Sequence, residues 1–278
     1  MLNKIQPSIT FARRTRAAFL SLAIAAVSLA SCKDDKDNVK PDDGNPPAED
    51  KAFLPEKDQI YTYRILDSDG EKSSSTLQVV NTKDSSGIAV YDIENVIQEG
   101  RVFVTTRSRA FSKGGLTTNE MLHEDAVHAL YDIVNEFAEI EDVTMSGFPQ
   151  KQVLENKGTV GSNVTFGKDP LKVDMALLIP IDEQNKIEAD WETTLTYLDG
   201  KATKQEEITT PAGTFKCTKW EYKYEMHIKL SSLFIPVEET EDVCTVELWT
   251  APGVGIVKSI ETVGEDSSTT ELQKITKK

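Results

Sequence analysis

The feature that most constrains this chain is a strict alternation of residue types between Trp220 and Leu230. Large apolar side chains occupy every even position of this stretch, and polar or charged ones occupy the odd positions. The even positions are Trp220, Tyr222, Tyr224, Met226, Ile228 and Leu230. A period of two is that of a β-strand with one face in a core and the other in solvent. The stretch therefore predicts a strand of an antiparallel sheet.

The same alternation recurs along the chain, which indicates that strands dominate it. Between 187 and 197 the odd positions include Trp191 and Leu195, while charged residues and threonines fall between them. Asp199-Gly200 follows at once and predicts a hairpin turn, because glycine accepts the positive φ of such turns. Further strands are expected at 61–65, 76–80, 87–97, 101–107, 152–156, 174–181, 203–209, 242–250 and 255–261.

One stretch upstream of Trp220 breaks the pattern. Phe215 and Cys217 lie on the parity opposite to that of the 220–230 strand. Two explanations fit this change: a bulge near Thr218, or a second covered face at that end of the strand.

A helical period interrupts the strands once. Apolar residues recur at steps of three and four at Leu122, Ala126, Leu130, Ile133, Val134, Phe137 and Ile140. Thr117 and Glu120 have the spacing of a capping box. We therefore expect one long amphipathic helix at about 117–141, packed on a curved antiparallel sheet. The fold class expected is α+β, mainly β, with the sheet forming a half-barrel.

The N-terminus has the features of a secretory signal peptide. Residues 1–31 carry four basic and no acidic side chains, and the apolar run 17–27 is too short for a membrane span. Leu29-Ala30-Ser31-Cys32 resembles a bacterial lipobox, which implies that Cys32 is diacylated and becomes the mature N-terminus. The following Lys33, Asp34 and Asp35 resemble the surface-export signal of Bacteroidetes lipoproteins. These resemblances imply an outer-membrane lipid anchor at the cell surface, with the periplasmic face as the alternative.

Residues 32–51 comprise the lipidated cysteine and an acidic spacer that is rich in proline and poor in apolar residues. Such a composition predicts a disordered tether, and residues 52–278 are expected to form a single β-rich domain. Removal of the signal peptide leaves 27 basic and 46 acidic residues, a net charge of 27 − 46 = −19. A nucleic-acid partner is excluded by this charge, because phosphates require Lys and Arg.

No catalytic or metal-binding pattern is evident. His123 and His128 are five residues apart, so they point in different directions from one helix. No Gly-x-Ser-x-Gly elbow is present. Cys217 and Cys244 fall within expected strands and could be buried thiols or a structural disulfide. We therefore expect no enzyme activity, no cofactor and no metal.

Two stretches of the C-terminal half resemble a known group. They are Thr210-Pro211-Ala212-Gly213-Thr214-Phe215-Lys216-Cys217 and Trp249-Thr250-Ala251-Pro252-Gly253-Val254-Gly255-Ile256-Val257-Lys258. They resemble hairpins of bacterial envelope proteins of unknown function, many of which are lipoproteins similar to the LolA/LolB carriers. The resemblance covers residues 186–262 and implies a curved sheet around a helix. It includes no catalytic residue.

The first functional hypothesis is a surface lipoprotein that acts as a non-enzymatic binding or structural module, with a glycan or protein partner. The alternative is a carrier of a lipid or other hydrophobic ligand. The residues that would line its cavity could instead form an ordinary packed core. The lining of the carrier would be Trp191, Leu195, Trp220, Tyr222, Tyr224, Met226 and Ile228. A third hypothesis, an envelope hydrolase, requires a cleft with converging carboxylates or a metal. A glycan platform could include Trp249.

Overall fold

The computed structural model describes residues 52–182, 184–233 and 236–278. These residues form fourteen strands and one helix, α2 (His123–Val134). The strands are β1 (Gln59–Asp67), β2 (Lys72–Ser85), β3 (Ile88–Glu99), β4 (Val102–Lys113), β5 (Leu116–Met121), β6 (Glu139–Ser146), β7 (Gln150–Glu155), β8 (Asn163–Phe166), β9 (Leu171–Pro180), β10 (Lys186–Thr210), β11 (Gly213–Ser231), β12 (Glu238–Ala251), β13 (Gly255–Val263) and β14 (Asp266–Lys277).

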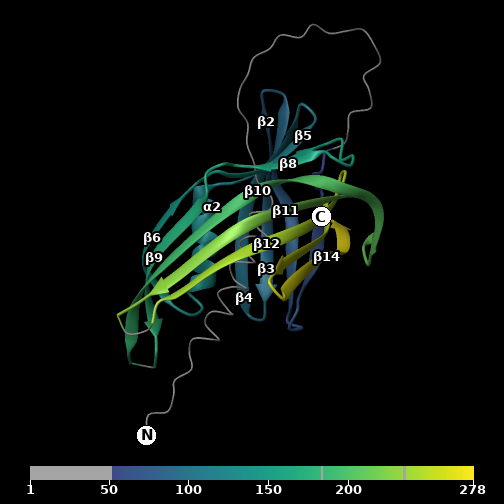
Figure 1. Cartoon of the computed structure of the whole chain (residues 1–278). Helices are drawn as coiled ribbons and strands as arrows, with labels where there is room; N and C mark the ends of the chain where they lie inside the picture. Colours follow the sequence, from purple (N-terminus) through teal and green to yellow (C-terminus); the bar gives the residue numbers. More distant parts are fainter. Residues whose placement is uncertain (1–51, 183, 234–235) are drawn as a thin grey trace, which may run out of the picture.

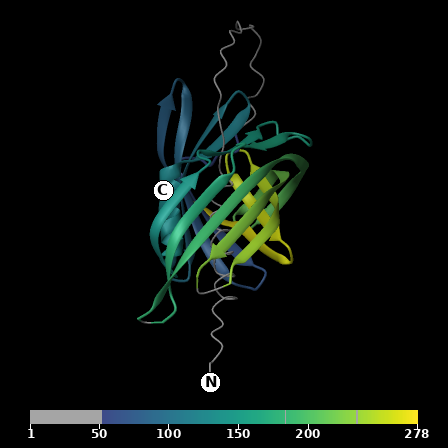
Figure 2. The same ribbon diagram turned by 60° about the vertical axis from the view of Figure 1, so that its left-hand side comes forward.

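All fourteen strands belong to one antiparallel sheet that closes on itself. The order is β11-β12-β13-β14-β1-β2-β3-β4-β5-β7-β8-β10, and β10 pairs back onto β11. This ring contains twelve strands, and β9 and β6 continue from β10 beside it. Figures 1 and 2 show the green strands β10 and β11 lying across the molecule from the blue strands β2–β4, while the yellow β14 pairs directly with β1. The expected half-barrel with a long helix is therefore wrong: the fold is a closed antiparallel barrel with a short helix.

The helix is shorter than its apolar pattern predicts, because the residues at both ends of the predicted range belong to strands β5 and β6. Residues 116–121 pair with β4 on one side and β7 on the other. The expected capping box is absent, since Thr117 lies inside β5 and the helix begins after Leu122 without a side-chain cap. Ile140, at the expected end of the helix, pairs with Leu177 of β9 instead. The apolar period of three and four therefore extends beyond the segment that forms the helix.

Helix α2 occupies a gap in the wall of the barrel. The first half of β4 pairs only with β3 among the described strands, because its pairing with β5 begins at Arg109. Strand β6 likewise pairs only with β9 within the described ranges. The helix packs between these two edges and buries Ala126, Ala129, Leu130, Ile133 and Val134. Asp132 of the helix accepts a hydrogen bond of 3.2 Å from the Thr105 backbone N–H of β4.

Strand β10 runs through the position where a hairpin turn was expected. The pairing of β10 with β11 shifts register between Leu198 and Lys201, so Asp199-Gly200 forms a bulge inside a strand of 25 residues. A Cβ on Gly200 would lie 2.0 Å from the Glu221 carbonyl oxygen, which explains why the close approach requires glycine. At this bulge β10 leaves β9 and pairs with β8. The bulge therefore lets one strand serve both parts of the wall.

The strand predicted from the 220–230 alternation is confirmed within β11. All of its even positions are at most 9% exposed and belong to the main core cluster inside the barrel. Upstream, Cys217 belongs to a second cluster with Trp249, Ala251 and Val257. The pairing of β10 with β11 also shifts register between Ala202 and Lys204. The extra residue at this shift is Thr203 of β10, and β11 pairs with β12 from Thr218 onward without a shift. The expected bulge near Thr218 is therefore absent from β11, and the second explanation holds: that end of the strand has another covered face.

Candidate functional site

The residues expected to line a hydrophobic ligand are core residues. Trp191, Leu195, Trp220, Tyr222, Tyr224, Met226 and Ile228 all lie in the main cluster and are at most 9% exposed. Ala126, Leu130 and Val134 of α2 belong to the same cluster. Trp191 donates a hydrogen bond to Thr193 and Trp220 donates one to Thr250, so both indole N–H groups are used inside the protein. Side chains thus fill the space between the helix and the aromatic face of β11.

A carboxylate lies within this interior. Glu261 of β13 is 1% exposed, and the Tyr224 hydroxyl donates to its Oε2 over 3.2 Å. Burial disfavours the charged form and raises the pKa of Glu261 to about 8, although the Tyr224 hydrogen bond acts in the opposite direction. Glu261 is therefore mostly a neutral acid at pH 7.

Two further phenols accompany Glu261. The hydroxyls of Tyr197 and Tyr222 and Oε1 of Glu261 are buried and have no hydrogen-bond partner among the described residues. The ring of Phe166 lies 5.0 Å from that of Tyr197 and 4.8 Å from that of Tyr222. Burial raises the pKa of both tyrosines, which keeps them neutral. This cluster can hold a proton or an ordered water, but it is closed to a substrate from solvent.

Sequence analysis missed this cluster, and the sequence contains no clear signal for it. In β13 the buried Ser259 and Glu261 share one face, but Val257 belongs to the second cluster with Cys217 and Trp249. The pairing of β12 with β13 shifts register between Trp249 and Thr250. Because this irregularity interrupts the alternation of the expected strand 255–261, parity does not mark Glu261 as an inward residue.

The two cysteines lie too far apart to form the disulfide that was left open. Both are buried free thiols. The register places Cys244 opposite Tyr224, seven residues along β11 from Cys217, which corresponds to about 23 Å. Disulfide geometry requires Cα atoms within about 7 Å. Burial raises the pKa of each thiol to about 12, so neither is an activated nucleophile.

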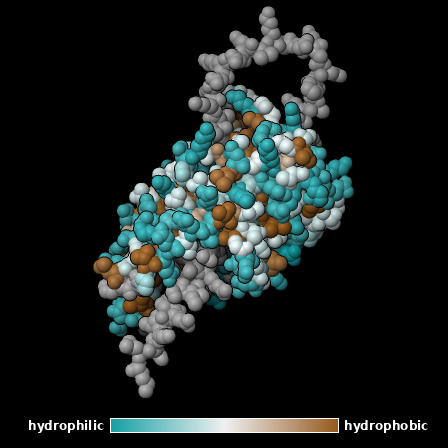
Figure 3. Space-filling model, in the orientation of Figure 1, coloured by the Kyte–Doolittle hydropathy of each residue, from teal (hydrophilic) through white to brown (hydrophobic). Residues whose placement is uncertain are grey.

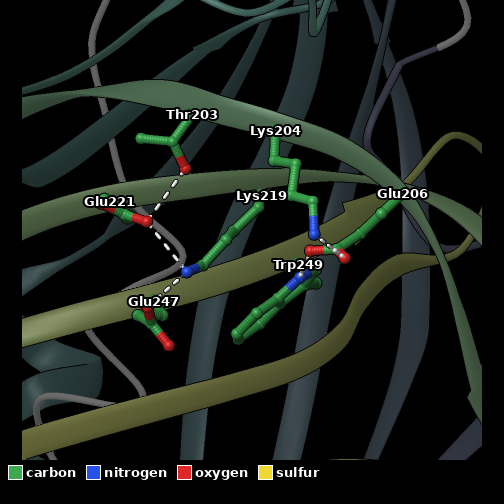
Figure 4. A network of polar contacts seen from close by, with 7 residues as sticks. All are labelled: Thr203, Lys204, Glu206, Lys219, Glu221, Glu247 and Trp249. Carbon is green, nitrogen blue, oxygen red and sulfur yellow. Dashed lines mark hydrogen bonds and ion pairs between the residues drawn. The ribbon is translucent and has the colours of Figure 1, made fainter.

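Trp249, considered for a glycan platform, lies in a polar network on the outer face of the sheet (Figure 4). It is 6% exposed, and its indole N–H donates to Glu206 over 3.0 Å. The ammonium groups of Lys219 and Lys258 lie 5.0 and 5.3 Å from its ring centre. Lys219 also contacts Glu247 and, at 2.9 Å, Glu221. The ring face is thus covered by cations, which suits a structural role better than sugar stacking.

The histidines are not brought together. His123 and His128 are exposed, and the His123 ring meets the edge of Phe148. His227 lies 2.7 Å from Glu239 on the polar face of its hairpin. The described ranges contain no group of three or more His, Cys, Asp or Glu side chains that could hold a metal ion.

One end of the barrel is covered by the first described residues, which we call the N-terminal segment (residues 52–56). The Gly253 N–H donates to the Ala52 carbonyl over 3.1 Å, and the Phe53 N–H donates to the Thr117 hydroxyl over 3.0 Å. Phe53 and Leu54 are only 4% and 7% exposed. Thr117, expected as a helix cap, thus serves to hold this segment at the barrel mouth.

A small cavity lies beneath the N-terminal segment. Its volume is about 40 Å³, and Phe53 and Pro55 form part of its wall. Most other lining residues are apolar, but Gln152 and Asn119 also contribute. The Nε2 amide of Gln152 is buried and has no hydrogen-bond partner within the described residues. A separate open groove of about 380 Å³ lies at the end of α2, between residues 135–139 and strands β9 and β10.

Some expected features lie outside the described residues. These are the signal peptide, Cys32 and the export signal Lys33, Asp34 and Asp35. Among the described residues, no helix combines the length and the apolar character that crossing a membrane requires.

Comparison with known proteins gives a family and a fold. The sequence matches the DUF3108-like family over residues 59–272. Two crystal structures resemble it, a "putative lipoprotein" from Parabacteroides distasonis and a "putative exported protein with YmcC-like fold" from Bacteroides fragilis. Each is 18% identical with a TM-score of 0.50, and the alignments cover 81% and 82% of this chain and 99% of each of those chains. No curated protein matches. The finer resemblance to LolA and LolB stays a prediction.

Proposed function

Because this chain belongs to the DUF3108-like family, whose match extends over residues 59–272, we propose that it is a lipid-anchored envelope protein with a non-enzymatic barrel that binds or supports a partner. The anchor is the lipid on Cys32, and the export signal Lys33, Asp34 and Asp35 directs the domain to the cell surface. The similar structures, a "putative lipoprotein" from Parabacteroides distasonis and a "putative exported protein" from Bacteroides fragilis, support this location.

The observation that carries the proposal is the filled interior of the barrel. The aromatic face of β11 and the apolar face of α2 share one packed core cluster. The cavity under the N-terminal segment measures about 40 Å³, whereas pockets for organic ligands measure about 300–1,000 Å³. Recognition should therefore take place on the outer surface or at the barrel ends.

The alternative of a hydrophobic-ligand carrier has less support for the same reason. Its expected lining consists of residues that already contact one another. Native mass spectrometry of the purified domain decides between the two: a chain without bound lipid supports the binding module, and stoichiometric co-purified lipid supports the carrier.

The charge of the mature chain supports a domain that projects from the membrane. At −19 it is repelled by anionic lipid headgroups, so attachment depends on the acyl chains. The face seen in Figure 3 is mostly hydrophilic, with apolar residues scattered over it. Such a surface is suited to an aqueous environment.

Anchoring is tested with the full precursor in a bacterial host that exports lipoproteins. Cys32→Ser should abolish palmitate labelling and move the protein from the membrane fraction to the soluble fraction. A triple variant, Lys33→Ala, Asp34→Ala and Asp35→Ala, should retain the label and lose protease accessibility on intact cells. Unchanged membrane attachment of Cys32→Ser would contradict the proposal.

A further inference from the structure

The N-terminal segment is held at the barrel mouth in the way that a peptide ligand is held in a groove. It lies outside the strands, and the backbone of its first two residues bonds to partners far away in the sequence. Gly253 binds the Ala52 carbonyl, Thr117 binds the Phe53 N–H, and the Tyr61 hydroxyl accepts from the Glu56 N–H over 2.9 Å. Main-chain bonds of this kind give a peptide its affinity and are independent of its side chains.

Two neighbouring side chains of the segment enter two different pockets. The Phe53 ring meets Trp220 edge to face at 5.6 Å and joins the main core. Leu54 joins a separate cluster with Val79, Ile93 and Ala110. Pro55 packs against Gly255, on which a Cβ would lie 3.5 Å from the proline Cδ. The pockets therefore select an aromatic residue, an aliphatic residue and a proline in that order.

The segment fills its groove incompletely. The cavity of about 40 Å³ remains under Phe53 and Pro55. Gln152 lines that cavity, and its Nε2 amide has no acceptor among the described residues. A buried unpaired donor carries a desolvation cost, so an occupant that offers an acceptor and more volume would fit better.

We propose that the barrel mouth is a peptide-binding groove for extended aromatic–aliphatic–proline segments, which the chain's own residues 52–56 occupy in cis. This inference names the partner class of the proposed binding module and rests on that function. Only Lys57 and Asp58 join the segment to β1, so it can leave the groove while the strand stays paired. The partner is an extended peptide that ends in, or carries, such a motif and displaces the cis segment.

The covalent connection of the N-terminal segment to β1 determines how strongly it competes with a separate peptide for the groove. A short tether gives an effective concentration in the millimolar range, so a peptide in trans binds the wild-type mouth weakly. Removal of the two anchoring side chains should release the groove.

The test uses soluble mature chain, residues 32–278 with Cys32→Ser, and a fluorescein-labelled peptide of residues 52–58 (Ala-Phe-Leu-Pro-Glu-Lys-Asp). The variant Phe53→Ala/Leu54→Ala should bind this peptide at least tenfold more tightly than the wild-type chain does, as measured by fluorescence anisotropy. The same peptide with Phe53→Ala should bind at least tenfold more weakly to that variant.

The matched control is Ile181→Ala/Val237→Ala, which truncates two exposed apolar side chains away from the mouth. It should bind the peptide as weakly as the wild-type chain does. Equal binding by all three chains, or no binding by a folded Phe53→Ala/Leu54→Ala chain, would overturn the inference. Because the protein carries no lipid in this assay, the result is independent of the anchoring test.

A second measurement applies if the double variant does not fold. In the wild-type chain the Phe53 amide should exchange its hydrogen at least tenfold faster than the ladder amides of β1 do, because the segment opens separately. Equal protection of the segment and the strand would show that it is a fixed part of the core, and would overturn the inference.

Discussion

Glu261 illustrates how a single residue can set a property of the whole interior. It lies on the inward face of β13, and within the described part of the chain its carboxylate accepts one hydrogen bond, from Tyr224. Desolvation therefore dominates and keeps the proton on the acid near neutral pH. The nearby Tyr197 and Tyr222 hydroxyls carry no charge that could compensate.

This raised pKa predicts that stability falls as the pH rises from about 4.5 to about 8. The folded chain keeps a proton on Glu261 up to pH about 8, whereas the unfolded chain loses it near 4.5. Stability therefore falls as pH rises through this window, by up to about 1.4 kcal/mol per unit. Relative to Glu261→Gln, the wild-type chain should lose stability between pH 5 and 8 in urea unfolding. Parallel curves for the two chains would contradict this, and the exposed Glu265→Gln serves as the control.

Gly158 supports the Phe53 pocket by leaving space. A Cβ there would lie 2.4 Å from the Thr218 hydroxyl and 2.8 Å from the Phe53 ring, and φ is +54°. Gly158→Ala should therefore lower the free energy of unfolding by about 2–4 kcal/mol.

Gly100 is the matched control for this substitution. Its φ of +59° is close to that of Gly158, but no atom lies within 4 Å of its Cβ position. Gly100→Ala therefore measures the backbone cost alone, and the difference between the two variants in urea unfolding measures the clash. Equal losses would mean that Phe53 and Thr218 move aside freely.

At the scale of single elements, alternation predicted the strands with large apolar residues and missed those without them. Strand β11 was clear because tryptophan and tyrosine mark its inward face. Strand β14 was not expected, since its buried positions are mostly Ser268, Thr270 and Leu272. Small hydroxyl side chains can face a core beside larger neighbours, but their alternation carries little hydrophobic contrast.

Helix α2 and β5 show a second limit of sequence patterns. Thr117 and Glu120 have the spacing of a cap, yet both lie in a strand that pairs with β4, the strand just before it, and with β7, about 30 residues later. The spacing of residues 117 and 120 does not reveal which strands they pair with. Pairing with β4 and β7 makes this segment a strand in place of a helix end.

The contact between α2 and β4 predicts a local effect of Asp132→Ala. This change removes the acceptor for the Thr105 N–H and leaves the strand edge unbonded. Because the pair is exposed, we expect a loss of only about 1 kcal/mol in urea unfolding. The sharper readout is faster hydrogen exchange at the Thr105 amide. Glu124→Ala, in the first turn of the same helix, should leave that amide unchanged.

At the scale of the whole molecule, the closed ring could not be read from the sequence. Parity tells which face of a strand is buried, but it does not tell which edges meet. Closure depends on the pairing of β10 with β11 beyond the bulge and on β14 lying between β13 and β1. An open curved sheet and a closed barrel can have the same alternation, so the half-barrel expectation lacked this information.

Closure makes β14 indispensable. A chain that ends at Gly264 lacks the strand that pairs with both β1 and β13. It should show no cooperative thermal transition by circular dichroism. A chain that lacks residues 33–51 instead should melt within a few degrees of the intact one. Cooperative melting of the shorter chain would show that the barrel can close without β14.

The pairing of the first strand with the last also affects how the chain can fold in time. Gln59 pairs with Lys277, so one edge of β1 has no partner until nearly all of the sequence is present. During export from the N-terminus, we expect the domain to stay unclosed throughout threading. Under the proposed export, the native ring can form only after the final residues have crossed the membrane, and loop closure over such a separation is slow.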